Sequence, residues 1–452
     1  MPIILVVSLP RIYFGTCFLR VRRNLIITIV AFGNIACSSS FVRAQFVDSS
    51  LRAKAPLKLT LNQFISAVAT NNIELAAQRY NVSIAQAQIV AARVSPNPVA
   101  SFAGTRDVSD KEQPGTENGG LSETIEIGGK RHFRISVATK NLLTASSTLD
   151  DFFRTLRGTA ASAFVDAVAS SMIVQQKRKA FESLNRLAEL NRIRFKEGDI
   201  AEVDHNQALV DSLQAQGDLT SAEATASTAL LALVQLLGKL SAPLPRPSSD
   251  LRISDRNFGL PALLDRAMKT RPDIAAVRNT HASALASIGL ARANRLPDVT
   301  LNAGLQQTGS STNPINPSPN FNSLNFGFSV PLPVFNSLRG EYLVAVNTAL
   351  QSQKTLRSVE LKAEIDVRQS FERFRLAKER ASKYEGPVLD LAAKVLDARL
   401  AAYKTGGATL LDVLAAQKAD TDVRLASIDA LSERAKALVA LEQAANIWDI
   451  DF

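Results

Sequence analysis

The residue types that most often carry chemistry are scarce in this chain and lie far apart. The sequence of 452 residues has three histidines, His132, His205 and His281, and their spacing is not that of metal ligands. We therefore interpret them as solvated or locally hydrogen-bonded side chains. No Gly-rich phosphate loop, nucleophile elbow or metal pair is present, and scattered carboxylates on long helices are typical of solvated faces. The sequence predicts no catalytic residue, no metal site and no cofactor, and hence a protein that is not an enzyme.

The two cysteines, Cys17 and Cys37, both lie in what we interpret as an export signal. Three arginines precede the apolar run from Leu25 to Ala36, and Ala44 offers a small residue at a cleavage site. The run is shorter than the roughly 20 residues that a membrane-spanning helix needs. We predict a signal peptide over residues 1–44, so the mature chain has no thiol. Cys37 follows a partial match to a lipoprotein box, which leaves its lipidation open.

The formal net charge of +10 raises the question of nucleic acid binding. The basic residues alternate with acidic ones along helical stretches, and the aromatic stacking motifs of RNA-binding proteins are missing. This pattern indicates a solvated surface and predicts no nucleic acid partner.

The sequence contains an internal repeat, which defines the domain organisation. One stretch, "NIELAAQRYNVSIAQAQIVAARVSPNPVASFAG", aligns with "RPDIAAVRNTHASALASIGLARANRLPDVTLNAG" about two hundred residues later, and "RFKEGDIAEVDHNQA" aligns with "AYKTGGATLLDVLAA". The second alignment pairs Lys196 with Lys404, Gly198 with Gly406, and Asp204 with Asp412. We predict a first structural repeat over 45–242, a linker over 243–257 and a second repeat over 258–452.

Each half is predicted to hold helices, two strands and a long helical hairpin. Both halves open with a short amphipathic helix, Leu61–Thr70 in the first and Leu260–Lys269 in the second. Apolar and polar residues then alternate with the period of a strand. The predicted strands cover about 99–107, 121–127, 298–307 and 323–330. Polar segments between the strands of each pair, Asp110–Gly120 and Ser310–Asn320, are predicted to be exposed turns.

A very long stretch without proline follows each strand pair. It runs from Lys130 to Ser241 in the first half and from Leu338 to Gly386 in the second. Gly198 and the pair Gly406-Gly407 are expected to mark turns between antiparallel helices. At 1.5 Å per residue, a helix from Lys130 towards the first turn reaches on the order of 100 Å, far more than a globular domain requires.

Strands with one apolar and one polar face are typical of transmembrane barrels. Four strands cannot close a barrel, and open sheet edges are not tolerated in hydrocarbon, so several chains must complete it. Two chains give eight strands and three give twelve, and only the larger barrel leaves a substantial aqueous bore. The predicted fold is mainly α, a long α-helical coiled-coil barrel with a small transmembrane β part. The alternative is two soluble hairpins that cap a coiled-coil stalk.

The twofold order of helix, strand, strand and helical hairpin resembles the TolC-type outer-membrane efflux family over nearly the whole mature chain. The motif "IEIGGKRHFRI", in which Gly128, Gly129, Lys130 and Arg131 lead from the second strand into the long helix, is similar to the cobalt-zinc-cadmium resistance branch. The segment "VPLPVFNSLRGEY" has the same place in the second half.

This resemblance implies a homotrimer with a twelve-stranded barrel in outer-membrane lipid and a tunnel of helices that extends into the periplasm. It also implies two partners, a periplasmic adaptor (membrane fusion) protein and an inner-membrane resistance-nodulation-division pump. The channel itself would perform no chemistry, because the pump supplies the energy.

The resemblance also assigns roles to residues at the helical turns. Asp204 and Asp412 match positions where the family has acidic residues near the closed periplasmic end, and carboxylates from three chains would form a constriction that favours cations. Ala415 departs from the family pattern, in which a second acid follows Asp412. The alternative for either aspartate is a helix cap.

The turns themselves are the candidate adaptor contacts, because loop tips are what a docking partner can reach. The residues expected to make this contact are Lys196, Gly198, Lys404 and Gly406.

Three functions remain open at this point. The Gly-Gly-Lys-Arg motif favours a channel for heavy-metal cations. A drug-efflux or type I secretion channel of the same fold is the second, and a non-channel periplasmic coiled-coil scaffold is the third.

Overall fold

The computed structural model describes residues 58–106, 114–239, 246–247, 251, 256–311, 315, 317–384 and 386–449. All of them belong to one compact unit, residues 53–452. The predicted signal peptide, residues 1–44, lies outside the described residues, as does most of the predicted linker. Where the linker is described, β4 (Arg246–Pro247) pairs in parallel with β1 (Lys58–Leu59).

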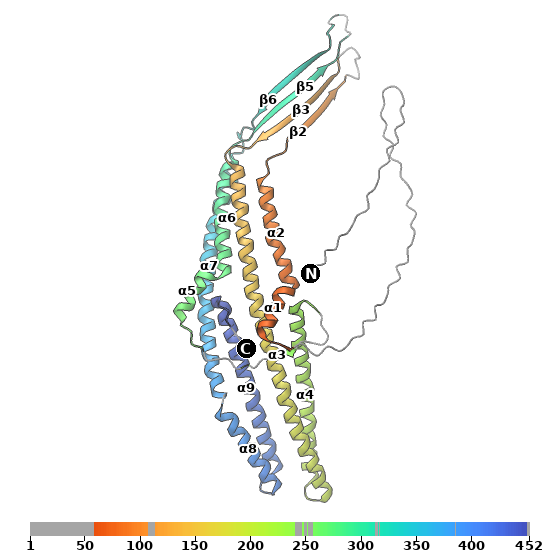
Figure 1. Cartoon of the computed structure of the whole chain (residues 1–452), viewed down its shortest axis with the longest axis vertical. Helices are drawn as coiled ribbons and strands as arrows, with labels where there is room; N and C mark the ends of the chain where they lie inside the picture. Colours follow the sequence, from red (N-terminus) through yellow and green to blue (C-terminus); the bar gives the residue numbers. More distant parts are fainter. Residues whose placement is uncertain are drawn as a thin grey trace, which may run out of the picture. The chain divides into compact units, whose positions relative to one another are not determined.

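The first repeat contains two helices, two strands and a long helical hairpin (Figure 1). In chain order its elements are α1 (Leu61–Asn71), α2 (Ile73–Arg93), β2 (Val99–Thr105), β3 (Thr116–Ile125), α3 (Lys130–Glu197) and α4 (Glu202–Leu237). The side chain of Thr60 caps α1 in a reciprocal box with Gln63, and the side chain of Asn72 caps α2. These caps place the first two helices end to end.

The second repeat follows the same order with one difference. Its elements are α5 (Leu260–Thr270), α6 (Pro272–Asn294), β5 (Val299–Thr308), β6 (Phe321–Ser329), α7 (Arg339–Tyr384), α8 (Pro387–Lys404) and α9 (Leu410–Ala445). The helix α3 runs unbroken for 68 residues, whereas α7 ends before Gly386, which has a φ of +117°, and Pro387 starts α8. Proline suits the first turn of a helix but cannot continue one, so the break follows from the sequence.

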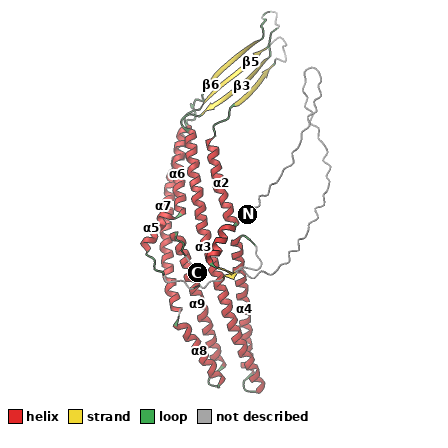
Figure 2. Ribbon diagram, in the orientation of Figure 1, coloured by secondary structure: helices red, strands yellow, loops and turns green. Residues whose placement is uncertain are grey.

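The four longer strands form one antiparallel sheet in the order β2-β3-β5-β6, which confirms two strands per half (Figure 2). The two repeats meet where β3 pairs with β5. Each outer strand, β2 and β6, has a single partner in this sheet. The sheet therefore presents two open edges. Figure 1 shows it at one end of the long helices, with the two hairpin turns at the other.

The strand register places most apolar side chains on one face, although Glu117, Glu123, Gln307 and Asn322 lie on that face as well. Residues on one face include Phe102, Leu121, Ile125, Leu301, Leu305, Leu324, Phe326 and Phe328. Residues on the other include Ser101, Asn118, Ser122, Thr124, Thr300, Asn302, Gln306, Ser323, Asn325 and Ser329. Phe102, Phe326 and Phe328 are 85%, 76% and 74% exposed. Large exposed apolar side chains of this kind are typical of a surface that contacts lipid or another protein.

The strand β3 begins earlier than the sequence predicted. The segment Asp110–Gly120 was expected to be a turn, but β3 starts at Thr116, and its glycines lie inside the sheet. Gly119 pairs with Phe102, and a Cβ on Gly119 would lie only 3.3 Å from the Phe102 ring. Glycine here makes room for a cross-strand aromatic ring, which explains why a turn signal occurs within a strand.

The helices pack through small side chains around a narrow core. Alanine dominates the buried positions of α3 and α9, and the larger core rings Phe64 and Phe164 lie 5.8 Å apart. Small residues let helix axes approach closely along a long seam. Within the described residues, no helix combines the length and the apolar composition needed to cross a bilayer.

Two buried arginines connect the repeats near the middle of the helices. Arg154 of α3 donates from Nη1 to the carbonyl oxygen of Gln443 at 2.8 Å, and Arg271 donates to that of Ala444 at 3.1 Å. Both carbonyls belong to the last turn of α9, where the helix supplies few donors, and the Asn446 N–H reaches the Gln443 carbonyl only at a long 3.4 Å. The arginines therefore satisfy the end of the last helix and bind it to both repeats.

Candidate functional site: the helical tips and the strand-to-helix neck

The two hairpin turns predicted from the repeat have the same backbone geometry. Gly198 and Gly406 have φ values of +85° and +80°. In the first turn the N–H of Asp199 donates to the carbonyl of Arg194 at 2.9 Å, and in the second the N–H of Gly407 donates to that of Ala402 at 2.8 Å. These are the bonds of a Schellman motif, which needs a left-handed residue and so favours glycine. We call the two turns, residues 196–199 and 404–407, the tips.

The tip residues that the sequence singled out are at the surface. Lys196 and Lys404 are exposed, and a Cβ on Gly198 or Gly406 would meet no atom within 4 Å. The open space around both glycines means that the backbone angle alone, and not crowding, selects glycine at these two positions.

The two matched aspartates occupy the same helical position but make different contacts. Asp412, in the first turn of α9, forms a reciprocal capping box: its Oδ2 accepts from the N–H of Thr409 at 3.0 Å and from the Thr409 hydroxyl at 2.8 Å. These donors hold the pKa of Asp412 below its usual value. Asp204, in the first turn of α4, follows Ala201, which has no side chain to cap with. Asp412 is therefore part of a helix capping box, whereas Asp204 is an exposed carboxylate that belongs to no capping box.

A buried polar contact joins the two hairpins just above the tips, and sequence reasoning missed it. The Tyr403 hydroxyl of α8 donates to Asn191 Oδ1 of α3 at 2.5 Å, and Asn191 is fully buried. Arg194 lies over the Tyr403 ring, 5.2 Å from its centre. A small apolar cluster surrounds this contact: Leu187, Ala188, Ala208, Leu410 and Val413. The repeat held a usable signal, since it aligns Tyr403 with Phe195 and thus puts a hydroxyl in one half only.

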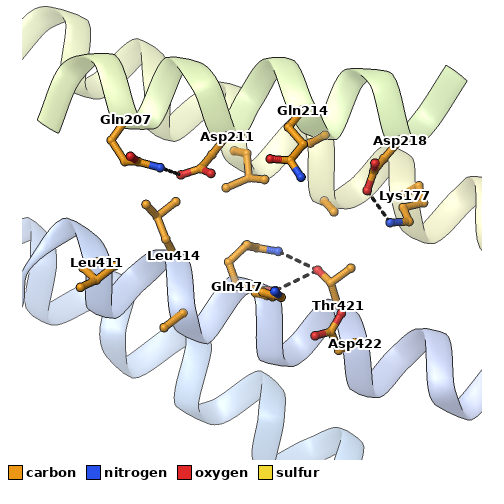
Figure 3. Close-up of a pocket in the computed structure, with 15 residues that line it drawn as sticks. Lys177, Gln207, Asp211, Gln214, Asp218, Leu411, Leu414, Gln417, Thr421 and Asp422 are labelled. Carbon is orange, nitrogen blue, oxygen red and sulfur yellow. Dashed lines mark hydrogen bonds and ion pairs between the residues drawn. The ribbon is translucent and has the colours of Figure 1, made fainter. Parts of the chain in front are cut away.

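Above the tips, a groove of about 410 Å³ separates α4 from α9, with α3 contributing to its floor (Figure 3). Figure 3 shows its polar side chains bonded mainly within each wall. Gln207 donates to Asp211 at 3.0 Å, Lys177 donates to Asp218 at 2.7 Å, and the Thr421 hydroxyl lies 3.4 Å from Gln417 Nε2. None of these three bonds crosses from α4 to α9, whereas the Ser183 hydroxyl of α3 donates to Gln417 Oε1 of α9 at 2.8 Å and joins the two hairpins beside the groove.

The Gly-Gly-Lys-Arg motif lies at the joint between β3 and α3, which we call the neck. Gly128 and Gly129 have φ values of +75° and +72°, and a Cβ on Gly128 would lie 2.7 Å from the Leu296 side chain. Lys130 Nζ bonds to Asp298 Oδ1 at 2.7 Å, and Arg131 donates from Nε to the carbonyl of Arg93 at 2.7 Å. The glycines make the sharp turn into the helix, and the two cations attach that turn to β5 and α2.

The histidines have local contacts. His205 stacks on Phe195 at 5.4 Å, His132 lies edge-on to Phe133 at 5.6 Å, and His281 Nδ1 lies 2.8 Å from the Ser352 hydroxyl. Over the part of the chain that the structure describes, no group of three His, Cys, Asp or Glu side chains could hold a metal ion.

The chain matches a family model described as "Outer membrane efflux protein" over residues 64–239 and 263–446, one segment in each repeat. Two curated relatives cover most of the chain. The cobalt-zinc-cadmium resistance protein CzcC of Cupriavidus metallidurans is 24% identical over 85% of this chain and 89% of its own length. The pyoverdine export outer membrane protein OpmQ of Pseudomonas aeruginosa is 27% identical over 75% of this chain and 73% of its own length.

The fold is shared with solved structures of outer-membrane proteins. VceC of Vibrio cholerae superposes with a TM-score of 0.68 at 20% identity, over 85% of this chain and 95% of that one. The two-part family match and the shared fold confirm the family resemblance and the predicted fold class of long helices with four strands in two repeats. The chain therefore belongs to the outer membrane efflux protein family and is a protein of the outer membrane.

Proposed function

We propose that this chain is one of three identical subunits of a channel that passively conducts substrate from the periplasm to the outside. The observation that carries the proposal is the sheet, with an exposed apolar face, a neutral polar face and two open edges. An unpaired edge is not tolerated in hydrocarbon, so β2 of one chain must pair with β6 of the next. Three chains of four strands give 3 × 4 = 12 strands around a water-filled lumen.

The channel works with two partners in this proposal, a periplasmic adaptor protein and an inner-membrane resistance-nodulation-division pump. The exposed tips, with Lys196, Gly198, Lys404 and Gly406, are the adaptor contacts. Their support is positional: the two turns lie at the end of the helices opposite the sheet, where a periplasmic partner can reach them (Figure 1). The pump supplies the energy, since the channel only has to provide a continuous wet path.

The proposed substrates are heavy-metal cations. The Gly-Gly-Lys-Arg motif and the similarity to a cobalt-zinc-cadmium resistance protein support this choice. The second candidate, a channel of the same fold for drugs or secreted products, has support from the similarity to a pyoverdine export protein at comparable identity. The third, a non-channel scaffold, leaves the exposed apolar face of the sheet without a contact.

A sensitivity assay on a deletion strain tests the substrate class. We expect loss of the gene to lower the tolerated concentration of cobalt, zinc or cadmium salts, with recovery when the gene is restored, and no change for a panel of drugs. Drug sensitivity with normal metal tolerance would instead support the second candidate, a channel for drugs or secreted products. Purified mature protein that forms no conducting pores in a planar lipid bilayer would contradict a channel of either kind.

A further inference from the structure

The neck carries a cluster of charges from both repeats. Lys130 bonds to Asp298 at 2.7 Å, and Arg134 Nη2 bonds to Glu126 Oε2 at 2.9 Å. Arg295 donates from Nε to the carbonyl of Ser337 at 3.0 Å, and no ion pair joins Arg295 to an acidic residue of the described chain. The bond to Glu126 is the main cause that raises the pKa of Arg134 above its ordinary value, so this guanidinium stays charged.

Lys130, Asp298 and Arg295 lie next to the polar face at the end of the sheet. The hydroxyls of Thr124 and Thr300 are 3.1 Å apart on that face, and continuing the β3–β5 register by one pair brings Glu126 opposite Asp298. An open pocket of about 460 Å³ supplies independent support, because Thr124 and Thr300 line it together with Lys130, Asp298 and Arg295.

Beyond the neck, the polar face holds no charge in any described strand. Its side chains are hydroxyls, amides, glycines and a few apolar groups: Val99, Ser101, Ala103 and Thr105 on β2; Thr116, Asn118, Gly120, Ser122 and Thr124 on β3; Thr300, Asn302, Gly304, Gln306 and Thr308 on β5; Phe321, Ser323, Asn325, Gly327 and Ser329 on β6. Over the described residues, the neck is therefore the last fixed charge that an exported solute passes before it enters the strand-lined part along this face.

The neck charges do not cancel completely. Of the charged side chains that line the pocket, one acid, Asp298, accompanies two bases, Lys130 and Arg295, which gives −1 + 2 = +1 per chain. Glu126 and Arg134 pair with each other and add no net charge. The side chain of Lys130 is only 10% exposed and that of Asp298 is 27% exposed, so solvent screens this pair weakly. Removing the lysine charge would uncover a carboxylate that faces the pocket.

We propose that Lys130 is a specificity-determining residue, which prevents Asp298 from making the neck of the channel attractive to cations. The proposal rests on the trimeric channel proposed above, in which the neck becomes a ring of three identical clusters. A ring of like charges in a narrow, wet constriction focuses the field and selects ions by sign. With Lys130 present, the ring is positive and passes anions at least as readily as cations. Selection of metal ions must then occur elsewhere in the assembly.

Reversal potentials across planar bilayers under a KCl gradient test this role with the purified mature channel. Lys130→Met keeps the length of the side chain and removes its charge, and we expect the ratio of potassium to chloride permeability to rise about threefold or more. Asp298→Asn should shift it in the opposite direction, since Lys130 is then unpaired. The double variant Lys130→Met with Asp298→Asn should return close to the wild-type ratio. Lys269→Met is the matched control, because Lys269 pairs with Asp265 at 2.8 Å on α5, away from the neck.

The outcomes separate this inference from the channel proposal. Conducting Lys130→Met channels with the wild-type ratio would overturn it, and so would a double variant that stays cation-selective. If Lys130→Met does not assemble, the opposite shift in Asp298→Asn decides the question, and an unchanged ratio there overturns the inference. Wild-type protein without conductance would instead count against the channel itself.

Discussion

At the scale of single residues, comparing Asp204 with Asp412 distinguishes two roles of a carboxylate near the tips: its charge and its contribution to helix capping. The reciprocal capping box of Asp412 contributes to helix stability, whereas Asp204 has no such box. If three chains form a negative constriction here, Asp204→Ala and Asp412→Ala should both raise the resting conductance in a lipid bilayer. Only Asp412→Ala should also destabilise the protein, by about 1 kcal/mol, as measured by chemical unfolding. Unchanged conductance in both variants would exclude the negative constriction, and the remaining role of Asp412 would be helix capping.

The buried Tyr403–Asn191 contact leads to a second prediction. Tyr403→Phe removes the hydroxyl bonded to Asn191 Oδ1 and leaves a buried amide without that partner, which costs about 1–3 kcal/mol. We expect amide hydrogen exchange of α8 and the adjacent part of α3 to become faster. Tyr342→Phe is the control, because Tyr342 contacts Arg292 through its ring. Equal exchange in the two variants would show that the contact contributes nothing to holding the hairpins together.

Glu442 gives a prediction about pH. Burial, and then its hydrogen bond with the Asp449 side chain, raise the pKa of Glu442 from 4.5 to about 8, although Arg256 Nη1 lies 3.4 Å from Glu442 Oε1. Between these two pH values the folded state keeps a proton that the unfolded chain has released. The stability linked to this group is therefore complete below pH 4.5 and is lost as the pH rises through about 8.

Glu442→Gln should remove this dependence and stabilise the protein at pH 8 by roughly 1–3 kcal/mol, with little change at pH 4. Unfolding by denaturant at both pH values measures the difference. Glu379→Gln is the control, since Glu379 is an exposed residue paired with Lys383 at 3.1 Å. A Glu442→Gln variant that is less stable than the wild type at pH 8 would show that Glu442 is ionised and useful in the folded state.

Sequence reasoning found the turn glycines, which belong to a local pattern, and missed the contacts that depend on distant partners. The repeat alignment was enough to predict the tip glycines, because a left-handed turn is a local requirement. The bonds from Lys130 to Asp298 and from Tyr403 to Asn191 join residues 168 and 212 positions apart. No pattern along the chain predicts such pairs, since they follow from how the repeats pack. The sequence also left the capping role of Asp412 open, because only the structure shows its bonds to Thr409.

At the scale of elements, the tips carry the adaptor-contact prediction. Gly198→Val and Gly406→Val force a branched side chain into a left-handed conformation, which costs on the order of 1–2 kcal/mol and changes the turn. We expect metal resistance to be lost while the assembly still forms, as measured by growth and by native gel. Gly217→Ala is the matched control: it lies within α4 with open space around it, so it should raise helix stability by about 1 kcal/mol and keep resistance. Full resistance in both tip variants would exclude the tips as the contact.

Helices were predicted more accurately than strands, for a physical reason. Amphipathic periodicity predicted α1 and α5, and the absence of proline predicted α3, almost to the residue, because helix formation depends on neighbours within four positions. The start of β3 was misplaced because Gly119 and Gly120 resemble a turn. In the sheet they face Phe102 and Gly304 on other strands, and a strand obtains its stability from such cross-strand partners.

At the scale of the whole molecule, every proposal depends on how copies of this chain meet. Within the described sheet, β2 and β6 each pair on one side only, and the apolar face lies open. Both features are costly for a chain alone in water, and both are resolved if three sheets close into one cylinder in lipid. The helices then continue the same closed wall, which explains why a chain of this length has such a narrow core of its own.

Disulfide crosslinking between the open edges tests this closure most directly. The mature chain is predicted to have no thiol, so Ser101 of β2 can be changed to Cys together with one β6 position, Ser323, Asn325, Gly327 or Ser329, in four separate variants. The two strands of one chain cannot link, because β3 and β5 lie between them and a disulfide needs Cα atoms closer than about 7 Å. We predict that one of the four registers yields a covalent trimer on a denaturing gel after mild oxidation in the membrane. Protein that stays monomeric in all four variants, and that remains in buffer without detergent, would contradict the channel.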